Sequence, residues 1–356
     1  MKHLRILSFT ALAVGLGFFT SCDDGEDVPT VIPPSESGLI EIQGGGAEYP
    51  NTSFIELKSG NQLAIARESW DLAFSSGSEF KVLINGTTGA MASATGKTDL
   101  NEVGAKKIAE VEDSGELILT FTNLQSILHV DNESNPLSAP VIAAINATED
   151  QNEVYILSRG SCAATERSLK KIRIIRNGKG YTLQHADADS TAFSSLDIPK
   201  SAEDKLVYVS FEKGIVDVEP SKTAWDISWT AGTSTAAFPQ AVNGTLAYFY
   251  QDLVYHNIYG GSSAAVMMEE DIAYESFEEQ DAASLEFNKT DRMTIGSSWR
   301  NGSGPPGSPA ATIKNNIYYI VKDAEANLYK VQFLSLTKDG VRGTPTFQYE
   351  LVAQGN

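Results

Sequence analysis

The sequence predicts an all-β fold of mostly antiparallel, sandwich-like sheets with few short helices, built as two related domains in tandem. Three observations lead to this prediction. Short segments rich in β-branched and aromatic residues recur along the chain, Asn-Gly pairs separate several of them, and one succession of motifs appears twice. Short strands joined by regular turns are typical of sheet-rich folds.

The predicted strands alternate apolar and polar side chains, as expected of strands with one buried face. The clearest examples are Phe54–Leu57, Phe80–Ile84, Glu116–Phe121, Ile172–Ile175 and Tyr329–Leu334. Asn-Gly pairs at 85–86, 177–178, 243–244 and 301–302 predict tight turns, because both residues tolerate positive φ. Helical periodicity is scarce, and we expect short helices only within Asp99–Val111 and Glu269–Leu285.

The internal repeat keeps the same order of motifs in each half of the chain. In each copy, a strand that ends in glycine precedes a Trp-Asp pair, and an Asn-Gly pair follows; the motifs are Gly60, Trp70-Asp71 and Asn85-Gly86, then Gly214, Trp225-Asp226 and Asn243-Gly244. Two later strands also recur, with Val154–Leu157 and Leu169–Ile174 matching Ile317–Val321 and Leu328–Phe333. A repeat of this kind sets the architecture, so we predict two copies of one domain, at 38–200 and 201–356.

The Trp-Asp pairs have a structural interpretation first. A Trp at the start of a strand is expected to pack in the core, while the neighbouring Asp caps a turn. Because the pair occurs in both copies, we predict a structural rather than a catalytic role for it.

Residues 1–21 have the pattern of a lipoprotein signal peptide. Lys2 and Arg5 precede an uncharged apolar stretch from Ile6 to Thr20, which is too short for a membrane-spanning helix. Small residues then precede Cys22 in an arrangement that resembles a lipobox. We therefore expect cleavage before Cys22, lipidation of that cysteine, and attachment to a membrane through the lipid.

Residues 22–37 are expected to form a flexible tether. Acidic residues occupy Asp23–Asp27, and prolines and serines follow, so the segment has too little apolar surface to fold. Acidic residues directly after a lipidated cysteine also resemble the surface-export signal of Bacteroidetes lipoproteins. The prediction is an outer-membrane lipoprotein exposed at the cell surface.

Composition excludes several classes of protein. The net charge of −19 repels nucleic acid and anionic membrane surfaces, so no nucleic-acid partner is expected. With Cys22 lipidated, only Cys162 remains, which rules out a disulfide-stapled domain.

Particular residues resemble the HmuY-like haem-binding lipoproteins of Bacteroidetes. The amino-terminal pattern of that family is matched by Gly60, Trp70–Phe74, Val82–Gly86, Gly89-Ala90 and Lys97-Thr98. Its carboxy-terminal pattern is matched in the second copy by Asn316–Asp323, Asn327, Tyr329–Phe333 and Phe347–Leu351. The resemblance covers both halves in pieces, and indicates a tandem, divergent version of the family's domain.

The resemblance implies a mostly-β haemophore that serves iron acquisition. Such a protein takes haem from host or environmental haemoproteins and passes it to a TonB-dependent outer-membrane receptor. The best-known members ligate the haem iron with two His, and relatives substitute Met. This sequence departs from that pattern, because the position of the second ligand lies near Gly304, which has no ligand atom.

The candidates for axial ligands are therefore other residues of the chain. Haem iron accepts His, Met, Cys or Tyr, and most of the His and Met residues of the mature chain lie in the second copy. Met267 or Met268 together with Met293 is the predicted haem-binding pair, and His256 is the alternate ligand. The competing interpretation is that the methionines fill gaps in the core and that His256 is a surface or turn residue. The first copy offers only His129, His185 and Met91, and we expect it to be structural or to bind a partner.

No catalytic pattern stands out, so the chain is predicted not to be an enzyme. Gly302, Gly304 and Gly307 match the spacing of a dinucleotide fingerprint, but Pro305 and Pro306 remove two amide donors and prevent a helix from starting there. Walker A, His-Glu-x-x-His and Gly-x-Ser-x-Gly patterns are absent. Three hypotheses remain: a haem-binding lipoprotein, a partner-binding or adhesion lipoprotein that kept the fold and lost the haem site, and, least favoured, a hydrolase.

Overall fold

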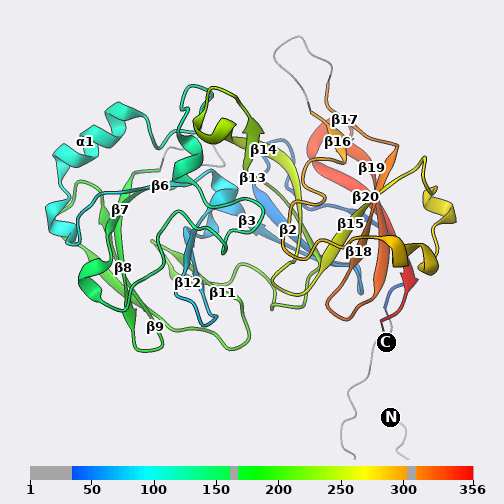
Figure 1. Ribbon diagram of the computed structural model, residues 1–356, viewed down its shortest axis with the longest axis horizontal. Coiled ribbons are helices and arrows are strands. Elements are labelled where there is room, and N and C mark those ends of the chain that lie inside the picture. The colour runs from blue at the N-terminus through cyan, green and yellow to red at the C-terminus, as the bar shows by residue number, and fades with distance from the viewer. Residues whose placement is uncertain (1–33, 161–166, 303–309, 356) are drawn as a thin grey trace, which may run out of the picture. The chain divides into compact units, whose positions relative to one another are not determined.

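The structure, a computed structural model, describes residues 34–160, 167–302 and 310–355. The predicted lipidation site Cys22, the signal peptide and Gly304 lie outside these ranges. Residues Pro34–Asn356 form one unit, in which antiparallel sheets dominate (Figure 1). The mostly-β, antiparallel prediction is confirmed.

The first five-stranded sheet belongs entirely to the first predicted copy. Its strand order is β10-β9-β8-β7-β6, with bounds β6 Met91–Ala94, β7 Val154–Ser158, β8 Lys170–Asn177, β9 Gly180–Asp187 and β10 Ser194–Ile198. One face buries Leu157, Ile172 and Leu183 completely in an apolar core. The β8–β9 hairpin turns at Asn177-Gly178, where Gly178 has φ of 54°, as the Asn-Gly pair predicts.

The second five-stranded sheet repeats this arrangement near the carboxyl end. Its order is β1-β20-β19-β18-β15, with bounds β1 Ser37–Glu41, β15 Ser263–Met268, β18 Ile317–Lys322, β19 Leu328–Lys338 and β20 Val341–Ala353. The adjacent pair β18–β19 occupies the place that β7–β8 holds in the first sheet. The later strands of the predicted repeat are therefore confirmed.

Two four-stranded sheets draw strands from both copies. Their orders are β12-β11-β4-β5 and β14-β13-β2-β3. The strand bounds are β2 Asn51–Glu56, β3 Asn61–Ala66, β4 Leu72–Ser75, β5 Val82–Ile84, β11 Leu206–Ser210, β12 Gly214–Val216, β13 Ile227–Ala237 and β14 Thr245–His256. We call these two the shared sheets. A two-stranded ribbon joins β16 Arg300–Asn301 to β17 Thr312–Ile313.

The copies interlock through these shared sheets. Strand β4 of the first copy pairs with β11 of the second, with Ala73 opposite Tyr208, and β2 pairs with β13, with Phe54 opposite Ser228. The opening strand β1 likewise pairs with β20, the last strand of the second copy. The limits 38–200 and 201–356 stay a prediction, to which the structure adds that strands cross between the two regions.

Helices are few and short, as predicted. The part of the chain that the structure describes has one α-helix, α1, which spans Ala105–Ser114 and ends at Gly115, with φ of 66°. The 3-10 helices are η1 Arg67–Ser69, η2 Gly86–Thr88, η3 Leu100–Glu102, η4 Ser126–His129, η5 Glu149–Gln151, η6 Val242–Gly244, η7 Tyr274–Ser276 and η8 Glu279–Ser284. The helix expected within Asp99–Val111 corresponds to η3 and α1.

The strand predicted at Glu116–Phe121 is wrong, because this segment forms turns after α1. The side-chain amide of Asn123 donates hydrogen bonds to the carbonyl oxygens of Glu116 and Ile118 at 2.8 and 3.0 Å, which closes the segment on itself. Ile118 and Phe121 are more than half exposed. Alternating side chains favour a strand only where a neighbouring strand accepts the backbone hydrogen bonds.

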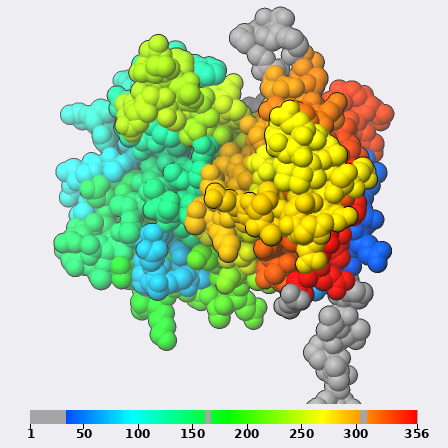
Figure 2. Space-filling model, turned by 45° about the vertical axis from the view of Figure 1, so that its right-hand side comes forward, coloured from blue at the N-terminus to red at the C-terminus, as the bar shows by residue number. Residues whose placement is uncertain are grey.

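The segment Glu269–Leu285 contains only the 3-10 helices η7 and η8, where the sequence allowed for a short helix. Its apolar side chains Tyr274 and Phe277 pack on Tyr318 of β18. Residues three apart share a face in 3-10 geometry, so this spacing is enough to cover the sheet. In Figure 2 the segment is yellow and lies at the surface, which leaves its acidic side chains in solvent.

Candidate functional site

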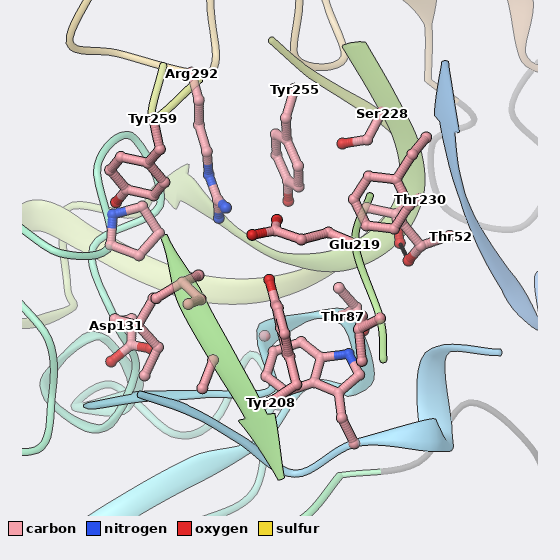
Figure 3. A pocket seen from close by; sticks show the side chains of 18 of the residues that line it. Thr52, Thr87, Asp131, Tyr208, Glu219, Ser228, Thr230, Tyr255, Tyr259 and Arg292 are labelled. Carbon is pink, nitrogen blue, oxygen red and sulfur yellow. Dashed lines mark hydrogen bonds between the residues drawn. The ribbon is translucent and has the colours of Figure 1, made fainter. Parts of the chain in front are cut away.

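A cavity of about 120 Å³ is lined by strands of both shared sheets. Its lining includes Phe54 and Ala73 from the first copy and Tyr208, Ser228 and Tyr255 from the second. Figure 3 shows polar side chains from several elements pointing into it. The cavity is therefore built by the interlocking of the copies.

Two aromatic contacts between the copies form part of the wall of this cavity. Trp70 of the first copy meets Tyr208 of the second edge-on, at a centroid distance of 4.9 Å. Trp225 of the second copy meets Phe54 of the first in the same way, at 5.1 Å. All four rings line the cavity. The tryptophans of the repeated Trp-Asp pair thus hold the copies together around a shared space.

The aspartates of the repeated pair also reach across the copies. Asp71 accepts a hydrogen bond from the backbone N–H of Phe211 at 2.9 Å, and Asp226 accepts one from that of Leu57 at 2.8 Å. The structural role predicted for the pair is therefore present, but each carboxyl group binds the other copy instead of capping a local turn. A sequence repeat identifies which residues are equivalent in the two copies. It does not show whether each residue forms its hydrogen bonds within its own copy or with the other one.

Hydrogen bonds show that Asn257, rather than Asn243, corresponds to Asn85 of the first copy. The Asn85 side chain donates to the carbonyl oxygens of Arg67 and Trp70, each at 2.8 Å. In the second copy, the side chain of Asn257 donates the corresponding hydrogen bonds, to the carbonyl oxygens of Lys222 and Trp225. Asn243 lies instead in the β13–β14 turn with φ of 58°. The two copies differ here because β13 and β14 form a much longer hairpin than β4 and β5.

Arg292 presents a guanidinium group to the cavity (Figure 3). Its Nε donates to the carbonyl oxygen of Glu133 at 2.7 Å, and its Cζ lies 4.1 Å from the centroid of the Tyr255 ring. Within the described ranges, its terminal nitrogens form no hydrogen bond or ion pair with the protein. The guanidinium of Arg292 is therefore held in place, while its two terminal nitrogens stay available to bind a ligand.

Glu219 points toward Arg292 and Tyr208 (Figure 3). Burial raises the pKa of Glu219 to about 7, although hydrogen bonding to the Tyr208 hydroxyl and the charge of Arg292 act in the opposite direction. Burial also raises the pKa of Tyr208 well above its ordinary value and raises that of Tyr255. Both phenols therefore remain protonated and can donate hydrogen bonds near neutral pH.

Asp131 is a second acid in the lining. Its carboxylate oxygens accept hydrogen bonds from the backbone N–H groups of Ile84 and Val141, at 2.9 and 2.8 Å. Burial nevertheless raises its pKa to about 7. Both of its oxygens are used to join loop 131–141 to β5, so this acid positions the cavity wall.

His256 is the one predicted ligand that lines this cavity. It ends β14 and is fully buried, with Nε2 3.1 Å from the carbonyl oxygen of Asn288. Burial lowers its pKa to about 4, so the imidazole is neutral near pH 7. Its Nδ1 is buried and has no hydrogen-bond partner among the described residues.

The three methionines lie elsewhere. Met267 and Met268 are consecutive on β15 and face opposite sides of the sheet. Met267 packs in the cluster of Tyr274 and Tyr318, and Met268 packs against the other core of the same sheet. Met293 is half-buried beside Gly296, outside the cavity lining.

The first copy's candidates are also apart from the cavity. Nδ1 of His129 is 3.1 Å from the carbonyl oxygen of Ala92, and His185 packs on Phe211 with ring centroids 5.0 Å apart. Met91 is fully buried in a core cluster. Neither histidine nor this methionine lines the cavity.

These positions do not fit an iron held by two axial His or Met ligands. Among the described residues, the cavity lining contains one histidine and no methionine. Nor does this part of the chain contain a group of three or more His, Cys, Asp or Glu side chains placed to hold a metal ion. The site that the described residues do form is an aromatic cavity with a guanidinium and a titratable acid.

Sequence reasoning missed Arg292, Glu219 and Asp131. Each lies in a loop, without a recognisable motif around it. Their common signal is an apolar neighbour in the sequence, such as Val218 before Glu219 or Val130 before Asp131, and that signal is too general to select them.

Comparison with known proteins gives the family. A model of the HmuY family, described as HmuY protein, matches residues 48–198 and again residues 202–349. The chain belongs to the HmuY family, with two tandem matches that confirm the two related domains of the sequence prediction. Members of this family are extracellular or surface binding proteins rather than enzymes.

Other comparisons are weaker. A search of curated proteins finds no match. Among solved structures, an apo HmuY analog from Tannerella forsythia has 10% identity and a TM-score of 0.31, and covers 90% of this chain and 99% of its own. Apo PinO from Porphyromonas gingivitis has 13% identity and a TM-score of 0.17, over 49% of this chain and 92% of its own. At such TM-scores these two likenesses have no bearing on the site.

No helix in the described ranges is long and apolar enough to cross a membrane.

Proposed function

We propose that this chain is a lipid-anchored, surface-exposed binding protein of the HmuY family that takes a ligand into the cavity between its copies. One observation carries the proposal: the cavity is lined by both copies and presents, among aromatic rings, an edge of the Arg292 guanidinium that has no partner within the described residues. A pocket with apolar walls and a few convergent polar groups is the usual form of a small-molecule site.

This proposal favours the hypothesis that the fold was kept while axial ligation of haem was lost. The supporting observation is the separation of the candidate ligands: Met267 and Met268 pack on opposite faces of β15, and the cavity contains His256 without a methionine. The pattern of Cys22 and the acidic tether supports anchoring at the outer surface.

Haem capture is the second candidate, and family membership together with the neutral imidazole of His256 favours it. In that case the protein would take haem from a haemoprotein and transfer it to a TonB-dependent outer-membrane receptor. Neutral imidazole is the form of histidine that ligates iron. A second axial ligand would still be needed for the ligation pattern implied by the family.

A haemin titration separates the two candidates. Residues 23–356 are titrated with haemin while the Soret band is recorded, and the variants Met268→Ala, Met293→Ala and His256→Ala are treated identically. We expect a featureless, non-saturating titration for all four proteins. A shifted Soret band that saturates at one equivalent and is lost in one of these variants would establish haem capture instead.

Anchoring is tested separately in cells. The Cys22→Ala variant is expected to lose membrane attachment, whereas Cys162→Ala keeps it, as measured by fractionation. Protease applied to intact cells should digest the wild-type chain if it is displayed at the surface. Protection from the protease until the cells are lysed would contradict surface display.

A further inference from the structure

Among the described residues, the lining of the cavity contains one cationic side chain, that of Arg292. Its Nε bond to Glu133 and its stacking on Tyr255 fix the plane of the guanidinium. A guanidinium with a free edge binds a planar carboxylate through two parallel hydrogen bonds. The first requirement of the ligand is therefore an anionic group that matches this edge.

The surroundings of Arg292 favour a single negative charge. Among the described residues, the acids in the lining are Glu219, Asp131 and Glu133. Burial raises the pKa of Glu219 and Asp131 to about 7, and the Glu133 carboxylate accepts hydrogen bonds from Ser234 and Thr235. None of the three forms an ion pair with Arg292 in the described part of the chain, so the guanidinium lacks a fixed counterion. A doubly charged phosphate would meet one arginine and three acids, whereas a carboxylate supplies the one charge that is missing.

The remaining walls are suited to an apolar body. Trp70, Trp225 and Phe54 contribute aromatic faces and edges, and Leu83 and Val218 contribute aliphatic ones. The volume of about 120 Å³ is slightly below the ~150 Å³ of an engineered cavity in another protein that binds benzene. The apolar body is therefore limited to about one ring or a short chain.

Two hydroxyl groups and one acid complete the polar end. Figure 3 shows the hydroxyls of Tyr208 and Tyr255 beside the carboxyl group of Glu219. Within the described residues, the Tyr255 hydroxyl has no hydrogen-bond partner in the protein. These groups can donate to the carboxylate oxygens that Arg292 does not saturate, provided that Glu219 is protonated.

On this basis, and resting on the proposed cavity function, we infer that the cavity binds a small monocarboxylic acid with an apolar body of about one ring. The carboxylate lies on Arg292, and the apolar body lies between Trp70 and Trp225. The interlocked copies thus act as the two halves of one binding site.

The inferred site has a defined pH dependence. Glu219 faces the ligand from the loop after β12, and the other titratable groups around the site are Asp131, Glu133, His256, Arg292, Tyr208, Tyr255 and Tyr259. His256 is neutral above about pH 4, and the tyrosines stay protonated. Ionisation of Glu219 removes a donor and adds a repulsive charge, so affinity decreases as pH rises through about 7.

Calorimetric titration of residues 23–356 tests the inference, with benzoate, cyclohexanecarboxylate and hexanoate as probes and benzamide as the neutral counterpart of benzoate. We expect at least one acid to bind with one-to-one stoichiometry, and benzamide to bind about tenfold more weakly than benzoate. Binding of benzoate should weaken as pH rises through about 7.

Arg176 provides a matched control for Arg292. Its Nε donates to the carbonyl oxygen of Ile145 at 2.8 Å, and its Cζ lies 4.1 Å from the Phe80 ring centroid, so it has the same type of setting outside the cavity. Arg292→Gln should weaken binding of the acid about tenfold or more, Arg292→Lys by less, and Arg176→Gln not at all. Circular dichroism verifies that each variant is folded.

The outcomes distinguish this inference from the proposed function. Equal binding of benzoate and benzamide, or unchanged acid binding by folded Arg292→Gln, would overturn the carboxylic-acid inference and leave the cavity as a binding site. If neither the acids nor benzamide bind, the inference and the proposed cavity function both fail.

Discussion

The indole ring of Trp70 meets the phenol ring of Tyr208 edge-on, with centroids 4.9 Å apart. Trp70 lies just before β4 of the first copy and Tyr208 lies in β11 of the second, so this contact joins the copies where they line the cavity. The contact of Trp225 with Phe54 is equivalent, but here the second copy provides the tryptophan and the first copy provides its partner. Stability and the shape of the candidate site therefore depend on the same side chains.

Replacing Trp225 by Ala should lower the free energy of unfolding by about 3–5 kcal/mol, because it empties a buried aromatic site. Urea denaturation of residues 23–356 measures the change. Phe193 is 42% exposed, and Phe193→Ala serves as the control, with an expected change within about 0.5 kcal/mol. Equal losses for the two variants would show that Trp225 is not a structural contact between the copies.

The two repeated aspartates should respond differently to loss of charge. Asp71 accepts two hydrogen bonds from Arg159, at 2.7 and 2.9 Å, in an almost fully buried ion pair. Asp71→Asn should therefore destabilise the protein by about 3 kcal/mol. Among the described residues, Asp226 has no arginine partner, and burial raises its pKa to about 7. Asp226→Asn at about pH 6 should keep or raise stability, since the wild-type carboxyl group must take up a proton on folding at this pH and the amide need not.

The comparison uses urea denaturation of both variants in the same buffer. A larger loss for Asp226→Asn than for Asp71→Asn would contradict the assignment of the buried charge to Asp71 and Arg159.

Stability should also depend on pH through Asp226. Its pKa is about 7 in the folded protein and about 3.9 in the unfolded chain, so the folded state binds more protons between these values. Its contribution is fully present below about pH 4 and is lost as pH rises through about 7. His256, with a pKa lowered to about 4, has the opposite effect between about pH 4 and 6.5.

The difference between wild type and Asp226→Asn isolates this contribution. Unfolding free energies measured from about pH 4 to about pH 8 should fall more steeply for the wild type than for the variant. Parallel profiles would mean that Asp226 titrates normally in the folded protein.

A buried cluster around Asp252 gives a further prediction. Asp252 is completely buried, pairs with Arg342, and is the nearest countercharge of Arg300, whose Nε lies 3.7 Å away. Asp252→Asn leaves the buried guanidinium of Arg300 and the partly exposed one of Arg342 without this countercharge, and should reduce stability by about 3 kcal/mol. Asn tolerates the positive φ of 56° at this position, so the backbone is not strained.

The control for this variant is Asp339→Asn. Asp339 also has a positive φ, of 50°, but it is exposed. Thermal and urea unfolding should differ from wild type by no more than about 0.5 kcal/mol. A small effect at both positions would show that the Asp252 cluster does not require a charge.

The sequence predicted the repeat and the sheet-rich fold because the Trp-Asp pairs and short alternating strands are local features. It did not predict the interlocking of copies, since equivalent strands can pair within a copy or between copies with the same side chains. Glu116–Phe121 has a strand-like pattern without a neighbouring strand, and this caused the wrong prediction there.

The candidate site was less accessible to prediction from sequence. Arg292 and Glu219 are far apart along the chain, and only the folding of the shared sheets brings them to one cavity. The methionines were selected for their ligand chemistry, but alternation along β15 directs Met267 and Met268 to opposite faces. The sequence shows which residues have side chains that could bind a ligand. Only the tertiary structure determines whether those side chains lie close together.

The most direct test of the shared cavity is a crystal structure of residues 23–356 soaked with 4-bromobenzoate, in which anomalous scattering locates the bromine. We predict one bromine peak between Trp70 and Trp225, with the carboxylate on Arg292. A well-occupied bromine site elsewhere, with this cavity empty or filled only by water, would contradict the account.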